Sequence, residues 1–282
     1  MRRPLSFSAM GDPSDLKATF RDVWDRAARS YDEAPRHGLR HDDERAAWGR
    51  LVAAVLGDPR HAAVPRLRVL DVGTGTGTLA LLAAGLGHEV TGLDLSAGML
   101  ERARRKGDAD GASVTWLVGD AEAPPFPAGS FDVVMSRHLV WTLPDPERAL
   151  AAWRALLAPG GLLVVVDGFR PPRPLPVRAA QALARRVAGE LRARRGLAHH
   201  DYPADAYRRL PLAAQQDTEA IAGRLRAAGF RDVRIRRTRE IDRVERRHLP
   251  PLERLGDAWR GYLATARANP PTPAVAEPRL GA

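Results

Sequence analysis

The sequence predicts an α/β protein built on a doubly wound, mostly parallel sheet. Three observations predict this fold. Short apolar segments with strand character alternate with helical patterns, a glycine-rich turn joins the first of these strands to a helix, and an acidic residue ends each of three strands. Alternating strands and helices are typical of a parallel sheet with helices on both faces.

Two helices are expected before the sheet. Asp12-Pro13-Ser14 can cap the first, whose apolar residues recur at helical spacing on one face. These residues are Leu16, Phe20, Val23, Trp24, Ala27 and Tyr31. The second helix is expected from about Asp42 to Leu56, with Trp48 packed in the core. For Tyr31, at the predicted end of the first helix, both packing and a role in a binding site remain open.

The first strand carries the most informative motif. The apolar segment Arg68–Val72 runs into Asp71-Val-Gly-Thr-Gly-Thr-Gly77, and a helix is predicted from Thr78 to Leu86. Glycines at such a junction let the backbone approach a ligand, and the helix N-terminus presents free N–H groups to it. A dinucleotide fingerprint needs glycines at i, i+2 and i+5, whereas these stand at i, i+2 and i+4. An acid beside this loop favours a ligand with an ammonium or sulfonium group.

The later strands repeat the pattern, with helices between them. They are expected at His88–Asp94, Val114–Asp120, Phe131–Ser136, Leu162–Asp167 and around Val233 and Ile235. The expected N-cap residues of the helices that follow are Ser96, Asp145 and Asp217. Pro146 suits the first turn of its helix.

Three of the acids are expected at one edge of the sheet. Asp71, Asp94 and Asp120 all stand near the carboxyl ends of predicted parallel strands, where ligands of doubly wound sheets bind. Asp94 follows Gly73 by 21 residues, about where a ribose-binding carboxylate belongs in this kind of fold. The three acids together therefore predict a ligand site rather than isolated surface charges.

An insertion from Phe169 to Gln216 separates the fifth strand from the next helix. Prolines between Pro171 and Pro176 lead into an apolar helical stripe from Val177 to Leu191. We expect this helix to cap the site. The run His199-His200-Asp201-Tyr202 contains metal-ligand residue types, but adjacent histidines in a loop point in different directions, so no metal is expected.

The C-terminal part gives a weaker pattern. A closing helix is expected to pack Leu252, Leu255, Trp259 and Leu263 on the sheet edge, and the charged stretch Thr238–His248 does not suggest a further strand. Proline-rich residues 270–282 are expected to form a disordered tail. The expected organisation is an N-terminal helical segment, a core, a cap, the rest of the core and the tail, at residues 1–60, 61–170, 171–216, 217–269 and 270–282.

The charge of the chain raises the question of a nucleic-acid partner. The formal net charge is +10 and the isoelectric point is near 11.0, which is a feature of nucleic-acid-binding proteins. The basic residues are nearly all arginine, with lysine only at Lys17 and Lys106, and they are spread along the chain. Abundant Arg, Ala, Gly and Pro also match a GC-rich coding bias, so nucleic-acid binding is not expected.

Other classes are disfavoured by what the sequence lacks. There is no cysteine, which excludes disulfides and thiolate chemistry. No apolar stretch reaches the roughly 18 residues of a membrane span, and the N-terminal segment is too short and polar for a signal peptide. A cytoplasmic protein, monomeric or homodimeric, is expected.

The chain resembles the class I S-adenosylmethionine-dependent methyltransferases over about residues 20 to 240, in the branch with the ubiquinone/menaquinone and small-metabolite enzymes. Five motifs in the same order carry this resemblance, together with the preceding helix Trp24–Asp32. The motifs are Asp71–Gly77, Gly92–Leu100, Gly119–Ala121, Ser130–Val134 and Leu157–Gly161. The resemblance implies a Rossmann-like sheet of seven strands and S-adenosyl-L-methionine as cofactor, with S-adenosyl-L-homocysteine as product.

The family pattern also implies residue roles. Gly73, Gly75 and Gly77 would contact the methionine part, Asp94 the ribose hydroxyls, and Asp120 the adenine amino group with Ala121 beside the ring. Asp71 would anchor the loop or the cofactor's ammonium group. The full set of expected cofactor-binding residues is Tyr31, Asp71, Gly73, Thr74, Gly75, Gly77, Asp94, Leu95, Met99, Asp120, Ala121 and Ser136.

Residues after the fourth strand are the candidates for catalysis. Arg137, His138 and Trp141 follow Ser136 at the edge that would face the transferred methyl group. His138 can take a proton near neutral pH, and Trp141 can form an aromatic wall against an acceptor or a cation. The alternative is that His138 caps the strand end and Trp141 packs the following turn.

The function expected from these features is methyl transfer to an N, O or C atom of a small aromatic or heterocyclic metabolite in specialised metabolism. A compact cap and aromatic residues near the predicted mouth favour a small acceptor. Two alternatives remain: an RNA or protein methyltransferase that uses the basic surface, and a protein that binds the cofactor without methyl transfer.

Overall fold

The computed structural model describes residues 13–171, 202–212 and 217–268, with a few isolated positions between 174 and 190. The strands in this part of the chain are β1 (Arg68–Val72), β2 (Glu89–Asp94), β3 (Val114–Val118), β4 (Phe131–Arg137), β5 (Leu157–Phe169), β6 (Arg231–Arg237) and β7 (Arg260–Arg267). The helices before β4 are α1 (Pro13–Ala27), η1 (Tyr31–Glu33), α2 (Asp42–Leu56), η2 (Pro59–His61), α3 (Thr78–Gly85) and α4 (Ala97–Asp110). Those after it are η3 (Val140–Thr142), α5 (Pro146–Leu156), α7 (Ala204–Arg208), α8 (Thr218–Ala227), α9 (Arg239–His248) and α10 (Pro251–Gly256).

The described strands form one seven-stranded sheet in the order β3-β2-β1-β4-β5-β7-β6. β1 pairs in parallel with β2 and β4, β2 with β3, and β4 with β5, whereas β7 is antiparallel to both β5 and β6. β2 and β3 lie on one side of β1, and β4 and β5 lie on the other side. The switch point where doubly wound sheets bind ligands is therefore between β1 and β4. The predicted mostly parallel, doubly wound sheet is confirmed.

Local sequence signals set the helix boundaries. The side chains of Ser96, Asp145 and Asp217 each accept a hydrogen bond from the backbone N–H three residues on, which satisfies one free donor at the start of α4, α5 and α8. The expected N-caps are therefore confirmed. The second predicted helix also has the expected bounds, because α2 spans Asp42–Leu56.

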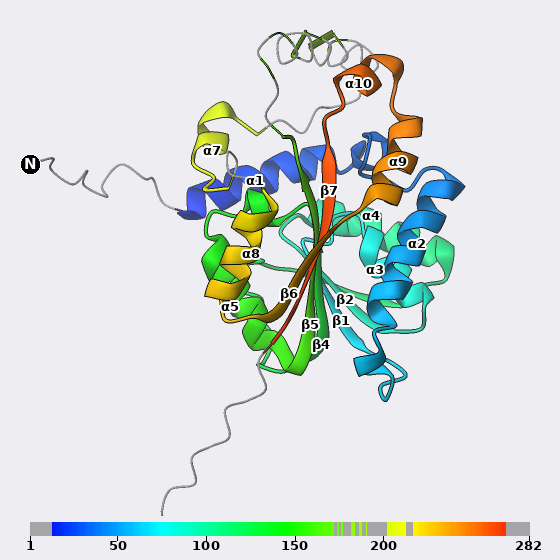
Figure 1. Cartoon of the computed structure of the whole chain (residues 1–282), viewed down its shortest axis with the longest axis vertical. Coiled ribbons are helices and arrows are strands. Elements are labelled where there is room, and N and C mark those ends of the chain that lie inside the picture. Colours follow the sequence, from blue (N-terminus) through cyan, green and yellow to red (C-terminus); the bar gives the residue numbers. More distant parts are fainter. Residues whose placement is uncertain are drawn as a thin grey trace, which may run out of the picture.

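Helices cover both faces of the sheet (Figure 1). On one face α5 and α8 bury Leu150, Trp153 and Leu225 against the sheet. On the other face α2, α3 and α9 bury a second cluster that includes Trp48, which is 2% exposed. Trp48 is thus a core residue, as expected. Two apolar cores hold the strands in fixed positions, and the strand ends carry the predicted site residues.

The C-terminal topology differs from the expectation. The predicted closing helix is wrong beyond Gly256: α10 ends there, and Leu263 lies in β7, paired with Val166 of β5. The side chains of Leu252 and Leu255 are not among those that the structure describes. The charged stretch Thr238–His248 forms α9, which buries Ile241 and Val244. The seventh strand follows this helix and lies between β5 and β6, buried along most of its length.

Helix α1 lies across the end of the sheet where the parallel strands finish (Figure 1). It ends at Ala27, so Tyr31 is not at its end but begins the short helix η1. Leu16, Phe20 and Val23 of α1 pack against Tyr202 and the neighbouring α7. The predicted cap helix 177–191, the run 199–201 and the tail 270–282 lie outside the described residues, apart from isolated positions of that helix.

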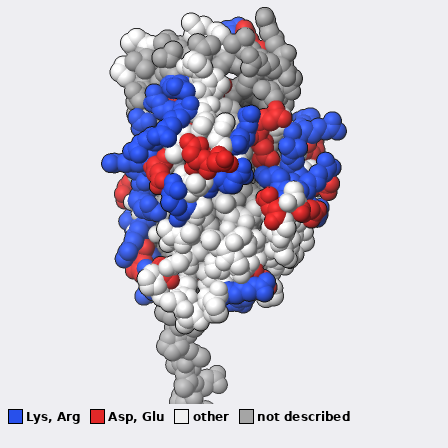
Figure 2. Space-filling model, turned by 90° about the vertical axis from the view of Figure 1, so that its right-hand side faces the viewer, with Lys and Arg blue, Asp and Glu red and all other residues white. Residues whose placement is uncertain are grey.

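The surface charges are mixed on the face shown in Figure 2. Lys and Arg side chains stand beside Asp and Glu side chains there, and the lower part of this face is mostly uncharged. Among the described residues on this face, acidic side chains therefore interrupt the basic ones. Among the described residues, no helix has both the length and the apolar character needed to cross a membrane.

Candidate functional site

A pocket opens between α1 and the carboxyl ends of the strands, with about 890 Å³ of empty space that includes its open mouth. It brings together most residues predicted for the site. These are Tyr31, Gly73, Gly75, Asp94, Leu95, Met99, Asp120, Ala121, Arg137, His138 and Trp141. Asp71, Thr74, Gly77 and Ser136 were also predicted, but they do not line this pocket.

The glycine loop and the end of β2 form one side of the pocket. Gly75 has φ +55, and a Cβ added there would meet only Tyr31 Cε1, at 3.8 Å, within 4 Å. The Gly75 N–H donates to Asp94 Oδ2 over 2.8 Å, and the Ser96 N–H donates to Asp94 Oδ1 over 2.9 Å. Burial raises the pKa of Asp94 to about 6, although both bonds oppose that rise. The carboxylate is thus fixed in position at the pocket wall.

Asp71 supports the loop from beneath. Its Oδ2 accepts from Thr74 Oγ1 at 2.7 Å and from the Ala80 N–H at 3.1 Å, and its side chain is buried. Burial raises its pKa to about 7, against the effect of these two bonds. Of the two roles expected for Asp71, the geometry supports anchoring the loop. Gly77 serves packing, because a Cβ there would lie 2.7 Å from the Trp116 ring.

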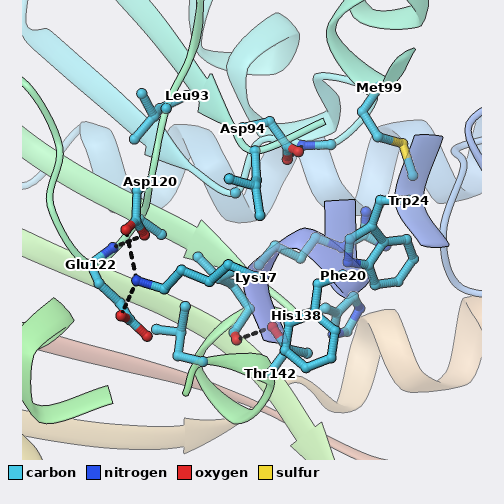
Figure 3. Close-up of a pocket in the computed structure, with 18 of the residues that line it drawn as sticks. Lys17, Phe20, Trp24, Leu93, Asp94, Met99, Asp120, Glu122, His138 and Thr142 are labelled. Atoms are coloured by element: carbon cyan, nitrogen blue, oxygen red, sulfur yellow. Dashed lines mark hydrogen bonds and ion pairs between the residues drawn. The ribbon is translucent and has the colours of Figure 1, made fainter. Parts of the chain in front are cut away.

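The loop after β3 forms a second, acidic side. Asp120 Oδ1 accepts from the Glu122 N–H at 2.9 Å, and Asp120 Oδ2 accepts from Lys17 Nζ at 2.7 Å. Lys17 reaches across from α1 and also pairs with Glu122 (Figure 3). Sequence reasoning missed both Lys17 and Glu122. The available signal was that Lys17 is one of only two lysines in an arginine-rich chain.

Aromatic rings form the wall opposite the strands. Phe20 and Trp24 of α1 and Trp141 of η3 line the pocket. Tyr202 holds them together, with ring centroids 4.6 Å from Phe20, 5.5 Å from Trp24 and 6.0 Å from Trp141. Such edge-on contacts stabilise an aromatic cluster beyond its buried area. The Trp141 ring is shared between this cluster and the pocket.

His138 lies at the end of β4 beside Asp167 of β5. Its Nδ1 is 3.4 Å from Asp167 Oδ1, and the Gly168 N–H donates to the same oxygen at 2.8 Å. Burial lowers the pKa of His138 well below its ordinary value, and nearby arginines lower it further. Burial raises the pKa of Asp167 to about 7. His138 is thus a neutral imidazole beside a carboxyl group, and sequence reasoning did not select Asp167 as a site residue.

Arg137 is engaged by the N-terminal segment. Its guanidinium donates to the carbonyls of Arg36 and His37 and stacks 4.4 Å from the Trp48 ring centroid. Through these contacts Arg137 connects the end of β4 to the loop before α2. Ser136 is fully buried, and its Oγ has no hydrogen-bond partner among the described residues. In the described part of the chain, no three metal-ligating side chains come together.

Comparison with known proteins adds independent findings. Residues 70–165 match the family model described as a methyltransferase domain. Over 167 residues the chain is 40% identical to the demethylmenaquinone methyltransferase of Thermus thermophilus, covering 58% of this chain and 74% of that protein. It is 43% identical over 98 residues to the aklanonic acid methyltransferase DauC of a Streptomyces species, covering 33% of this chain and 44% of that protein.

A solved structure has the same fold. It is the phosphoethanolamine N-methyltransferase 2 of Haemonchus contortus in complex with S-adenosyl-L-methionine, with a TM-score of 0.56 and 19% identity. The alignment covers 96% of this chain and 62% of that one, so the present chain spans less than two thirds of its length. At this identity the likeness concerns the fold alone.

Proposed function

The chain belongs to the class I S-adenosylmethionine-dependent methyltransferases, in the branch of the demethylmenaquinone methyltransferases, and we propose that it methylates a small ring-bearing metabolite in the pocket beneath α1. The arrangement of residues around that pocket is the main support for this proposal. Carboxylates and a glycine loop form one side of the pocket, and aromatic rings together with His138, whose Nδ1 lies 3.4 Å from Asp167 Oδ1, form the other side.

The residues present fit the cofactor. Gly75 leaves the backbone open to a ligand, and Asp94 keeps carboxylate lone pairs for two ribose hydroxyls in addition to the bonds that fix it. Asp120 would accept from the adenine amino group, with Leu95, Met99 and Ala121 beside the ring. The ammonium end of the cofactor would lie at the glycine loop that Asp71 anchors.

The bound cofactor supplies an electrophilic methyl group on a sulfonium centre. The residues of the chain have to place the acceptor in line with that group and exclude water, and positioning of this kind carries a large part of the rate. Where the nucleophile is O–H or N–H, His138 Nε2 would take its proton. Asp167 would hold the ring with hydrogen on Nδ1, which leaves Nε2 as the acceptor.

The lining supports an acceptor with a flat apolar ring. Phe20, Trp24 and Trp141 offer ring faces and edges, and binding sites for small molecules are mostly apolar with a few fixed polar groups. The named substrates of two relatives, demethylmenaquinone and aklanonic acid, agree with a small-molecule acceptor. We propose the same class for this chain, acting as a monomer or homodimer without a nucleic-acid partner.

The proposal is tested with cofactor labelled in its methyl group. The protein is incubated separately with a panel of phenols, quinols and nitrogen heterocycles, with total RNA and with a protein extract. We expect label in one or more small molecules and none in the polymers. Label only in RNA or protein would overturn the proposed acceptor class, and cofactor binding without any transfer would indicate other chemistry at this site.

A further inference from the structure

Lys17 forms a bridge between two carboxylates at the adenine end of the pocket. Its Nζ lies 2.7 Å from Asp120 Oδ2 and pairs with Glu122 Oε2 as well. Lys17 belongs to α1, whereas both acids lie in the loop after β3, more than one hundred residues away in sequence. Figure 3 shows the lysine side chain extended from α1 toward these two carboxylates.

The two acids have different surroundings. Glu122 has a side chain only 2% exposed; its Oε1 accepts from the Asp145 N–H at 2.7 Å, and its Oε2 contacts Lys17. Asp120 is more open, with a side chain 33% exposed, and it lines the pocket. A carboxylate oxygen can accept two hydrogen bonds, so Asp120 Oδ2 can bond Lys17 and a ligand donor together. Glu122 thus anchors the lysine, and Asp120 stays available to the ligand.

The same lysine completes the attachment of α1. Near the other end of that helix, Asp25 Oδ1 accepts from Ser96 Oγ at 2.5 Å and from the Gly98 N–H at 3.0 Å. Phe20 and Trp24 lie between Lys17 and this second attachment, and both line the pocket. α1 is therefore attached to the rest of the protein near both of its ends, and Phe20 and Trp24 lie over the cavity between the two attachments.

We propose that Lys17 is a positioning residue of the cofactor site, whose ammonium group holds the Asp120 carboxylate for the adenine amino group. The inference rests on the proposed function, because it takes adenine as the group that Asp120 meets. Burial alone would lower the pKa of Lys17, but its bonds to the two acids raise it above the ordinary value, so the ammonium stays charged.

The test compares two ligands in calorimetry: S-adenosylhomocysteine and S-inosylhomocysteine, in which a carbonyl replaces the adenine amino group. The proteins are the unaltered chain, Lys17→Met and Lys17→Arg. If Lys17 acts through Asp120, Lys17→Met should weaken the binding of S-adenosylhomocysteine at least about tenfold, which is about 1.4 kcal/mol of binding free energy. The same substitution should change the affinity for S-inosylhomocysteine less than about threefold. Lys17→Arg should restore part of the preference for adenine over the inosine analogue.

Equal weakening of both ligands would overturn the inference and leave Lys17 a structural role. Tighter binding of S-adenosylhomocysteine by Lys17→Met would also overturn it, since Lys17 would then compete with adenine. Lys17→Met leaves Glu122 as a buried charge without its partner and can make the protein unstable. In that case the double variant Lys17→Met/Glu122→Gln, which removes this charge, is measured instead of the single variant. Absence of any S-adenosylhomocysteine binding by the unaltered chain would refute the proposed function instead.

Discussion

His138 and Asp167 come together because β4 and β5 are adjacent parallel strands. Arg137 pairs with Val166 in the register of these strands, and the His138 N–H donates to the Val166 carbonyl over 3.0 Å. The next residue on each strand is therefore His138 on one and Asp167 on the other. His138 has φ +55, a left-handed conformation that is uncommon outside glycine. Such strain tends to persist at functional positions.

The first prediction concerns His138 as a base. His138→Ala and His138→Asn should lower kcat by about a hundredfold or more if its imidazole takes the acceptor's proton. Cofactor affinity, measured separately, should change little. Because burial and nearby arginines lower the pKa of His138, the unaltered enzyme should keep a neutral base throughout the range above pH 6.5.

A fall of only a few-fold in both variants, with an unchanged pH profile, would leave positioning as the mechanism. That outcome would suit an amine delivered neutral or an electron-rich carbon, which needs no strong base. His138 would then be a packing residue at the strand end.

The second prediction concerns Asp167. Burial raises its pKa to about 7, so the carboxyl is protonated below that pH and ionised above it. The ionised form accepts strongly from His138 Nδ1–H and leaves Nε2 free to take a proton, whereas the protonated carboxyl can donate to Nδ1 and place the ring hydrogen on Nε2. We therefore expect kcat/KM to rise between pH 6 and pH 8 with a midpoint near 7. In Asp167→Asn this rise should disappear. Adding Asp167→Asn to His138→Asn should cost little more, because the two residues act as one unit. Independent, additive losses in the double variant would contradict the pairing.

The third prediction concerns Asp94 and cofactor affinity. The ionised carboxylate accepts hydrogen bonds from ribose hydroxyls, and burial raises its pKa to about 6. S-adenosylhomocysteine affinity should therefore rise with pH through about 6 and level off above it. Asp94→Ala should lose roughly 1.5–3 kcal/mol for each of two charge-assisted bonds, and its affinity should not show this pH step. An unchanged affinity in the variant would show that ribose binds elsewhere.

The fourth prediction concerns stability at the loop before α2. Arg36 pairs with Glu245 at 2.7 Å and with Asp257 at 2.8 Å, and all three side chains are at most 10% exposed. Arg36→Met leaves two buried carboxylates without their partner, which should lower the free energy of unfolding by about 3–5 kcal/mol. Urea denaturation at pH 7 measures this change.

The exposed pair Arg50–Glu240 provides the matched control. Both of its side chains are more than half exposed, so Arg50→Met should change the free energy of unfolding by less than about 1 kcal/mol. Equal effects of the two substitutions would contradict the account of Arg36.

Much of the fold could be predicted because its signals are local. The glycine loop after Asp71, the cap residues Ser96 and Asp145, and the acid Asp94 at a strand end each depend on a few neighbouring residues. The structure places Asp94 and the glycine loop on one side of the same pocket. Their roles toward the cofactor stay predictions.

The missed features depend on distant pairing. Trp259 and Leu263 are four residues apart, a spacing that is typical of a helix. Leu263 instead lies in β7, which is paired on both sides and mostly buried. A strand buried on both faces lacks the polar–apolar alternation of a half-exposed strand. Lys17 and Asp167 are likewise ordinary in sequence. They become site residues only through the crossing of α1 over the sheet and the β4–β5 register.

Calorimetry of the unaltered chain with S-adenosylhomocysteine and with NAD, under the same conditions, tests which cofactor the pocket binds. We expect S-adenosylhomocysteine to bind with one site per chain and NAD not to compete with it. No binding of S-adenosylhomocysteine at millimolar concentration, with binding of NAD, would contradict this expectation.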